Sequence, residues 1–174
     1  MRKGFTLIEL MVSISILSVM VVFLYQSYAS LNRSNKFYAN ELTNITAQQL
    51  RKRVLFLDYS LAASKSIKIE NLGREEDIVF MQTSHSLHKI YNPYVAYVIK
   101  EKKLYRLESL RAFKEYPFSV DDEFVVDYLG EVNSFRVYQT DKKLKSKSGE
   151  IYLVHVDFQK EDNILLKIKL LNNE

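Results

Sequence analysis

The feature that most constrains this chain is an apolar run near its start that carries a single charge. Residues 5–25 read FTLIELMVSISILSVMVVFLY, and Glu9 is the only charged residue among them. A helix needs about 20 largely apolar residues to cross the hydrocarbon core of a bilayer, so the run predicts one transmembrane segment. A carboxylate inside such a segment is costly to insert and usually serves a function. Glu9 is therefore the first candidate functional residue.

The charges on either side of the run predict its orientation. Arg2 and Lys3 stand directly before it, whereas the first cation after it is Arg33. Positive flanks stay in the cytoplasm, so we expect a cytoplasmic N-terminus and an exported remainder. A secretory signal has a shorter apolar region of about 7–15 residues and small residues at its cleavage site, and this chain matches neither feature. A plain signal anchor, with Glu9 reaching the lipid headgroups, stays open as an alternative.

The segment Gly4-Phe5-Thr6-Leu7-Ile8-Glu9 resembles the prepilin signal of type IV pilins and type II secretion pseudopilins. The resemblance rests on a glycine, a phenylalanine and a glutamate in fixed register with the apolar run. It implies a leader of residues 1–4, cleavage between Gly4 and Phe5 by a prepilin peptidase, N-methylation of Phe5, and a role for Glu9 in filament assembly. Such a cut removes the charged residues before the apolar run and leaves the run in place as an anchor. Cleavage of a secretory signal instead removes the apolar run itself.

The resemblance also implies a set of partners. These are other pseudopilins or minor pilins, the prepilin peptidase and methyltransferase, assembly-platform proteins and the lipid of the bacterial inner membrane, with no small-molecule substrate and no cofactor. A carboxylate at the centre of a membrane helix costs about 2.5–3.5 kcal/mol. Glu9 lies near the helix start, where the helix dipole offsets part of this cost. The terminal amine of a neighbouring subunit would offset more, which would favour side-by-side packing.

The helical pattern continues beyond the apolar run. Neither glycine nor proline occurs between Phe5 and Glu70, and apolar residues recur at steps of mostly three, four or seven, as on one face of a helix. We therefore expect one helix from Phe5 to about Ala63, with residues 5–25 in the membrane and residues 26–63 as its continuation.

Residues 64–174 predict a β-rich globular head. Short runs there alternate between apolar and polar residues, which is typical of strands with one buried face. Lys102-Lys103 and Glu161-Asp162-Asn163 predict hairpin turns, Gly130 predicts a loop, and Asp121–Tyr128 is left open between helix and strand. The predicted fold class is α+β: a pilin-like lollipop whose mostly antiparallel sheet, or two small sheets, packs on the C-terminal half of the helix. The alternating runs are residues 66–70, 79–81, 95–100, 104–108, 135–138, 152–158 and 166–170.

The order of these elements is similar to that of J-type minor pseudopilins and of PilW-like minor pilins. The chain has no cysteine, so it lacks the C-terminal disulfide loop of many major pilins. Both features favour a minor subunit or a pseudopilin.

The charge of the chain does not favour nucleic-acid binding. The formal net charge is +4, and the leader supplies two of the cations. Lys142, Lys143, Lys145 and Lys147 cluster in one polar stretch, but no aromatic residues interleave with them to stack on bases, so we interpret the stretch as a solvated loop. Arg51-Lys52-Arg53 lies on the predicted helix, where the three side chains splay apart.

Two groups of residues are candidate metal ligands. His85 and His88 are three apart and could share a helical face, but two imidazoles seldom suffice for a site. Asp121-Asp122-Glu123, with Asp127 nearby, offers carboxylate oxygens, but calcium requires six to eight oxygens in a shaped loop. We therefore expect no metal site, and we interpret the acidic segment as a surface loop.

The sequence offers no catalytic motif. It contains neither a G-x-S-x-G elbow nor a Gly-rich phosphate loop. We expect no enzyme activity and no catalytic residue, but a structural minor pseudopilin that joins the pseudopilus of a type II secretion system, at its tip or priming complex. The alternatives are a minor pilin of a type IV pilus or of a DNA-uptake pseudopilus and, from another class, a membrane-anchored periplasmic enzyme or sensor.

Overall fold

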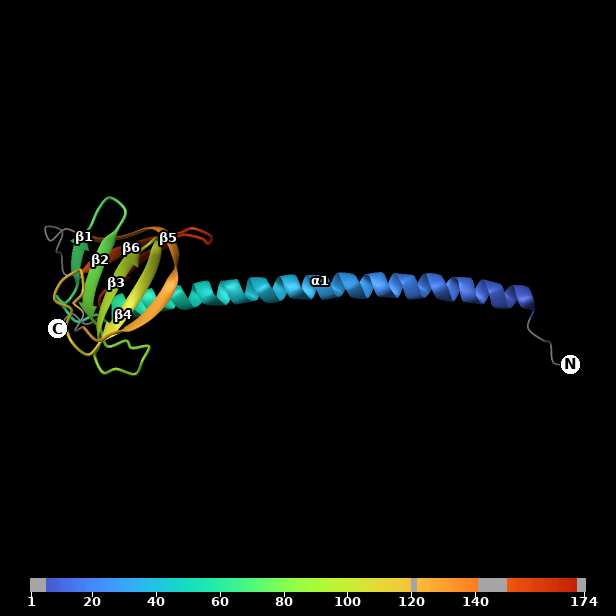
Figure 1. Cartoon of the computed structure of the whole chain (residues 1–174), viewed down its shortest axis with the longest axis horizontal. Helices are drawn as coiled ribbons and strands as arrows, with labels where there is room; N and C mark the ends of the chain where they lie inside the picture. Colours follow the sequence, from blue (N-terminus) through green and yellow to red (C-terminus); the bar gives the residue numbers. More distant parts are fainter. Residues whose placement is uncertain (1–5, 120–121, 141–149, 172–174) are drawn as a thin grey trace. The chain divides into compact units, whose positions relative to one another are not determined.

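The computed structural model describes residues 6–119, 122–140 and 150–171. Within these residues the chain forms one long helix followed by seven strands (Figure 1). The predicted α+β class, with a helix first and an antiparallel sheet after it, is confirmed. The elements are α1 (Leu7–Ser60), β1 (Lys68–Asn71), β2 (Asp77–Gln82), β3 (Tyr94–Lys100), β4 (Lys103–Ser109), β5 (Val125–Gln139), β6 (Ile151–Phe158) and β7 (Ile164–Lys169).

The chain divides into two compact units, residues 1–47 and residues 48–174. In the first unit the described residues are helical from Leu7 onward. The second unit contains the last turns of α1 together with the sheet. We refer to it below as the sheet unit.

Helix α1 is continuous because no glycine or proline interrupts its 54 residues. Ser13, Ser15 and Ser18 each donate a hydrogen bond to the carbonyl four residues earlier, at 2.7–2.9 Å. The three hydroxyls are therefore satisfied inside the helix, by the bond to a carbonyl one turn back that helical serines can form. The helix ends at Ser60, and shortly after it Ala62 forms an isolated bridge with Thr83.

The strands form one antiparallel meander in the order β1 to β7, so each strand pairs with its neighbours in sequence. Lys100 pairs with Lys103 across the β3–β4 hairpin, and the two residues between them have positive φ values of 53° and 59°. Positive φ at both central positions fits the two-residue hairpin turn that matches strand twist. The predicted hairpin is therefore confirmed, with its turn at Glu101-Lys102.

Strand β5 is long because it serves both halves of the sheet. It pairs with β4 as far as Glu131 and with β6 from Val132 onward. Gly130 lies just before this change of partner and has a φ of +146°. The prediction of a loop at Gly130 was wrong, because the glycine here serves an irregular point within a strand. The open assignment of Asp121–Tyr128 is settled for residues 125–128, which belong to β5.

Replacing Gly130 with alanine is expected to lower the free energy of unfolding by about 2–3 kcal/mol. A Cβ atom there would lie 2.8 Å from the Phe158 ring and 2.9 Å from the Arg51 guanidinium, in a backbone conformation that strains L-residues. Urea unfolding of the full-length protein in detergent measures the change. Gly73→Ala is the matched control, because a Cβ at Gly73 meets no heavy atom within 4 Å. An equal effect of the two substitutions would contradict this explanation.

The sheet is buried on both faces over part of its width. On one face, Leu55 and Tyr59 of α1 are fully buried against the strands, so the last turns of the helix form part of the main core. On the other face, Phe113, Phe118 and Phe124 pack around Phe80 of β2. The sheet also curls, since Glu76 just before β2 forms a parallel bridge with Phe135 of β5.

Candidate functional site

The described chain begins at Thr6, so Gly4 and Phe5 lie outside the described residues. Thr6 and Glu9 form a reciprocal pair at the start of α1. The backbone N–H and the hydroxyl of Thr6 donate to Glu9 Oε2 at 2.9 and 2.8 Å, and the Glu9 N–H donates to Thr6 Oγ1 at 3.4 Å. This is a capping box, in which a threonine and a glutamate three residues later satisfy each other's free N–H groups.

The signal that predicts this capping box is Thr-x-x-Glu before an apolar run, and sequence reasoning missed it. It gives Glu9 a role within its own chain, because the carboxylate fixes where the helix begins. Glu9 thus sits at the N-terminal end of the helix, close to the place where the resemblance puts the mature terminus.

The helix that Glu9 begins is long and apolar enough to cross a membrane. It contains a stretch of 18 strongly apolar residues, none of which is buried within the chain. The large apolar side chains between Leu7 and Tyr25 are all more than half exposed. By length and composition this helix suits a single-pass membrane anchor.

A second candidate site lies in the sheet unit, around a buried arginine of β4. Arg106 is fully buried. Its Nε donates to Asp58 Oδ2 at 2.7 Å, and its Nη1 donates to Glu108 Oε2 at 2.5 Å. Asp58 belongs to the last turns of α1, while Arg106 and Glu108 are two apart on β4 and so face the same side of the sheet. We call these three residues, with His85, His88, Tyr97 and Asp127, the ionic cluster.

The partners in the cluster fix its charge states. Burial by itself would lower the pKa of Arg106, but the hydrogen bonds and the charge of Asp58 outweigh it and raise that pKa. Burial by itself would raise the pKa of Glu108, but hydrogen bonds from Ser86, Arg106 and the Leu87 N–H lower it. Burial, together with the charge of Asp58, raises the pKa of Tyr97 well above its ordinary value. Glu108 is therefore ionised and Tyr97 is neutral near pH 7.

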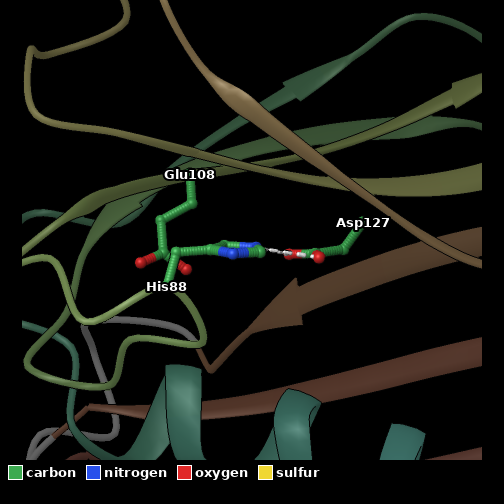
Figure 2. A group of neighbouring side chains, drawn as sticks. All are labelled: His88, Glu108 and Asp127. Carbon is green, nitrogen blue, oxygen red and sulfur yellow. Dashed lines mark hydrogen bonds and ion pairs between the residues drawn. The ribbon is translucent and has the colours of Figure 1, made fainter.

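The histidines extend the cluster toward solvent. His85 Nδ1 lies 2.5 Å from Asp58 Oδ1, and His88 Nε2 lies 2.9 and 3.0 Å from the two carboxylate oxygens of Asp127. Figure 2 shows the His88 imidazole pointing at the Asp127 carboxylate, with Glu108 reaching in from β4. Potential ligand atoms of His88, Glu108 and Asp127 lie within 4.8 Å of one another.

The structure thus arranges the candidate metal ligands differently from the sequence prediction. His85 and His88 lie on the connection between β2 and β3, not on a helix, and each turns to a different carboxylate. Asp127 joins His88. Asp122 instead accepts a hydrogen bond from the Ser119 N–H at 2.9 Å. Asp121 and the lysines at 142, 143, 145 and 147 lie outside the described residues.

Arg51 of α1 does not simply point into solvent, but contacts the rest of the sheet unit. Its Nη1 donates to the Leu129 carbonyl at 2.9 Å, its Nη2 contacts Glu161 at 2.7 Å, and its guanidinium lies over the Phe158 ring. Arg51 therefore helps to hold α1 against β5 and β6.

Replacement by phenylalanine is expected to change the free energy of unfolding in opposite directions at two buried tyrosines. The Tyr97 hydroxyl donates to Asp58 Oδ2 at 2.6 Å, whereas the buried Tyr59 hydroxyl has no hydrogen-bond partner within the described part of the chain. Tyr97→Phe is expected to lower the free energy of unfolding by about 1.5–3 kcal/mol, because a bond to a buried charge is lost. Tyr59→Phe is expected to raise it by about 1 kcal/mol, because an unsatisfied polar group is removed. Urea unfolding of both variants checks the signs, and a loss of stability in Tyr59→Phe would contradict the assignment.

A comparison with protein families bears on the N-terminal site. The model of the prokaryotic N-terminal methylation motif matches residues 1–25. No curated protein matches the chain. The matched residues include Gly4, Phe5 and Glu9, so the prepilin-type signal predicted from the sequence is confirmed at the level of the motif.

Proposed function

Because the chain carries the N-terminal methylation motif of the type IV pilin and pseudopilin family, we propose that it is a structural minor pseudopilin of a type II secretion system. In this proposal a prepilin peptidase cuts between Gly4 and Phe5, and Phe5 is N-methylated. The subunit then enters the pseudopilus, at its tip or priming complex. The match over residues 1–25 is the observation that carries the proposal.

The exposed surface of α1 supports assembly through helix bundling. A bilayer core is about 30 Å thick, whereas 54 residues of helix extend for about 80 Å. Beyond the span, a stripe of apolar side chains at helical spacing is 51–68% exposed within the chain. Lipid cannot cover a stripe that lies outside the bilayer, so helices of neighbouring subunits are its natural cover. The stripe consists of Tyr28, Leu31, Tyr38, Leu42 and Ile45.

In this proposal Glu9 sets how neighbouring helices are aligned along one another in the bundle. In the isolated chain its carboxylate bonds to Thr6, one residue after Phe5. Cleavage would create a charged amine on Phe5, and in an apolar bundle a carboxylate and an amine on adjacent subunits gain most by pairing with each other. We propose that Glu9 of one subunit pairs with the Phe5 amine of the next.

The proposal includes the topology of the subunit. Arg2 and Lys3 keep the N-terminus in the cytoplasm, α1 crosses the inner membrane once, and the sheet unit is exported. The role is structural rather than catalytic. The same motif would serve a minor pilin of a type IV pilus or of a DNA-uptake pseudopilus. Deleting the gene and assaying protein secretion, surface pili and DNA uptake separately distinguishes these machines.

Replacing Glu9 with leucine is expected to leave insertion and cleavage intact and to lower incorporation into filaments by at least about tenfold, the equivalent of 1.4 kcal/mol of lost pairing. Immunoblotting of the sheared filament fraction against the membrane fraction measures incorporation. Ser13→Leu is the matched control, because Ser13 bonds to the Glu9 carbonyl of its own helix and its replacement changes no charge. Full incorporation of the Glu9→Leu subunit would show that the carboxylate has no role in assembly.

A further inference from the structure

We propose that the sheet unit binds one divalent metal ion of the Zn²⁺ type between His88, Glu108 and Asp127. This inference does not depend on the proposed function, because it concerns the sheet unit and not the N-terminal signal. The three residues come from the β2–β3 connection, β4 and β5, and Figure 2 shows the His88 imidazole and the Asp127 carboxylate facing each other. Their potential ligand atoms already lie within 4.8 Å of one another.

The balance of charge in the ionic cluster favours a bound cation. Three carboxylates, those of Asp58, Glu108 and Asp127, surround the single guanidinium of Arg106. The side chains of Asp58, Glu108 and Arg106 are fully buried. Uncompensated charge is costly in such a place. Leaving the two histidines aside, the three carboxylates carry two more charges than the guanidinium offsets, and a divalent ion would supply two positive charges.

The hydrogen bonds around the three residues would orient them as ligands. Arg106 contacts Glu108 Oε2 and Asp127 Oδ2 rather than Glu108 Oε1 and Asp127 Oδ1, and Asp127 Oδ1 contacts His88 Nε2. Ser86 donates to Glu108 Oε1 and accepts the N–H of His88, so the connection that carries His88 is fastened beside Glu108. Supporting contacts of this kind, made to the ligands rather than to the metal, are a general feature of metal sites.

The ligand set also selects the type of metal. Calcium and magnesium prefer sites made of oxygen atoms, whereas imidazole suits zinc and neighbouring transition metals. Three protein ligands leave one position of a tetrahedral zinc site for water. The side chains of His88 and Asp127 are 33% and 22% exposed, so water and the ion can reach the site from that side. Bound metal would join the β2–β3 connection to β4 and β5 in a chain without disulfides.

The test uses full-length protein in detergent, free of any histidine tag and stripped with a chelator. Titration with Zn²⁺ alone is expected to show about one ion per chain, and saturating Zn²⁺ is expected to raise the midpoint of thermal unfolding by about 5–10 °C. Co²⁺ is expected to give the visible absorption bands of a four-coordinate site. Wild-type protein that neither binds Zn²⁺ nor gains thermal stability would overturn the proposal.

Substitutions test whether these three residues bind the metal. His88→Gln and Asp127→Asn are expected to lower Zn²⁺ affinity at least tenfold and to lose the Co²⁺ bands while keeping the far-UV circular dichroism of the wild type. His155→Gln, on the separate strand β6, is the matched control and is expected to bind as the wild type does. Equal Zn²⁺ affinity in His88→Gln and wild type would overturn the assignment, because His88 would then be only the ion-pair partner of Asp127.

Discussion

Replacing Arg106 with methionine is expected to lower the free energy of unfolding of the sheet unit by about 3–5 kcal/mol. The substitution keeps an unbranched side chain of similar length, but it removes the cation that contacts Asp58 at 2.7 Å and Glu108 at 2.5 Å. Both carboxylates are fully buried and would lose their main counter-charge. Since domains are stable by only about 5–15 kcal/mol, this one change would remove a large share of the total.

Urea unfolding of the full-length protein in detergent, followed by near-UV circular dichroism of the tyrosines, measures this effect. Arg111→Met is the matched control, because Arg111 is exposed and surface substitutions usually change stability by no more than about 0.5 kcal/mol. A loss below about 1 kcal/mol in Arg106→Met would mean that the buried carboxylates do not depend on the guanidinium.

Replacing Gly4 with leucine is expected to reduce cleavage of the leader on the order of 100-fold. In the proposed processing, Gly4 enters the peptidase site as the residue before the scissile bond, and a displacement of even about 1 Å of the reacting group can cost that much in rate. Because the amine of Phe5 exists only after cleavage, methylation should fail as well. The precursor should still insert, since residues 5–25 are unchanged.

Pulse labelling followed by gel separation of precursor and mature forms measures the rate of processing. Gly73→Leu is the control, since Gly73 lies far from the signal in the sequence and a Cβ there meets open space. Normal maturation of the Gly4→Leu precursor would contradict a prepilin-type cut at this bond.

The sequence predicted those features that depend on neighbouring residues. Helix α1 could be predicted because its residues include no glycine or proline. Its apolar span could be predicted from the composition of residues 5–25 alone. The alternation of apolar and polar residues likewise predicted most of the strands, and the short turns predicted their antiparallel order. The spacing of Gly4, Phe5 and Glu9 relative to the apolar run could be found by counting residues.

The ionic cluster could not be predicted, because its members come from α1, the β2–β3 connection, β4 and β5. Arg106 and Glu108 fit the alternation of a strand with a polar face turned to water, yet that face lies against Asp58 in the core. Only the pairing of the strands brings Asp127 beside Arg106. Gly130 was misassigned for a related reason, since a glycine in a bent strand and a glycine in a loop look the same in sequence.

The most direct test of the central claim is the intact mass and N-terminal sequence of the mature protein isolated from its native membrane. A prepilin-type subunit predicts a chain that begins at Phe5, carries one N-methyl group and retains the whole apolar segment through Tyr25. A chain that still begins at Met1, or one cut after Tyr25, would contradict the account.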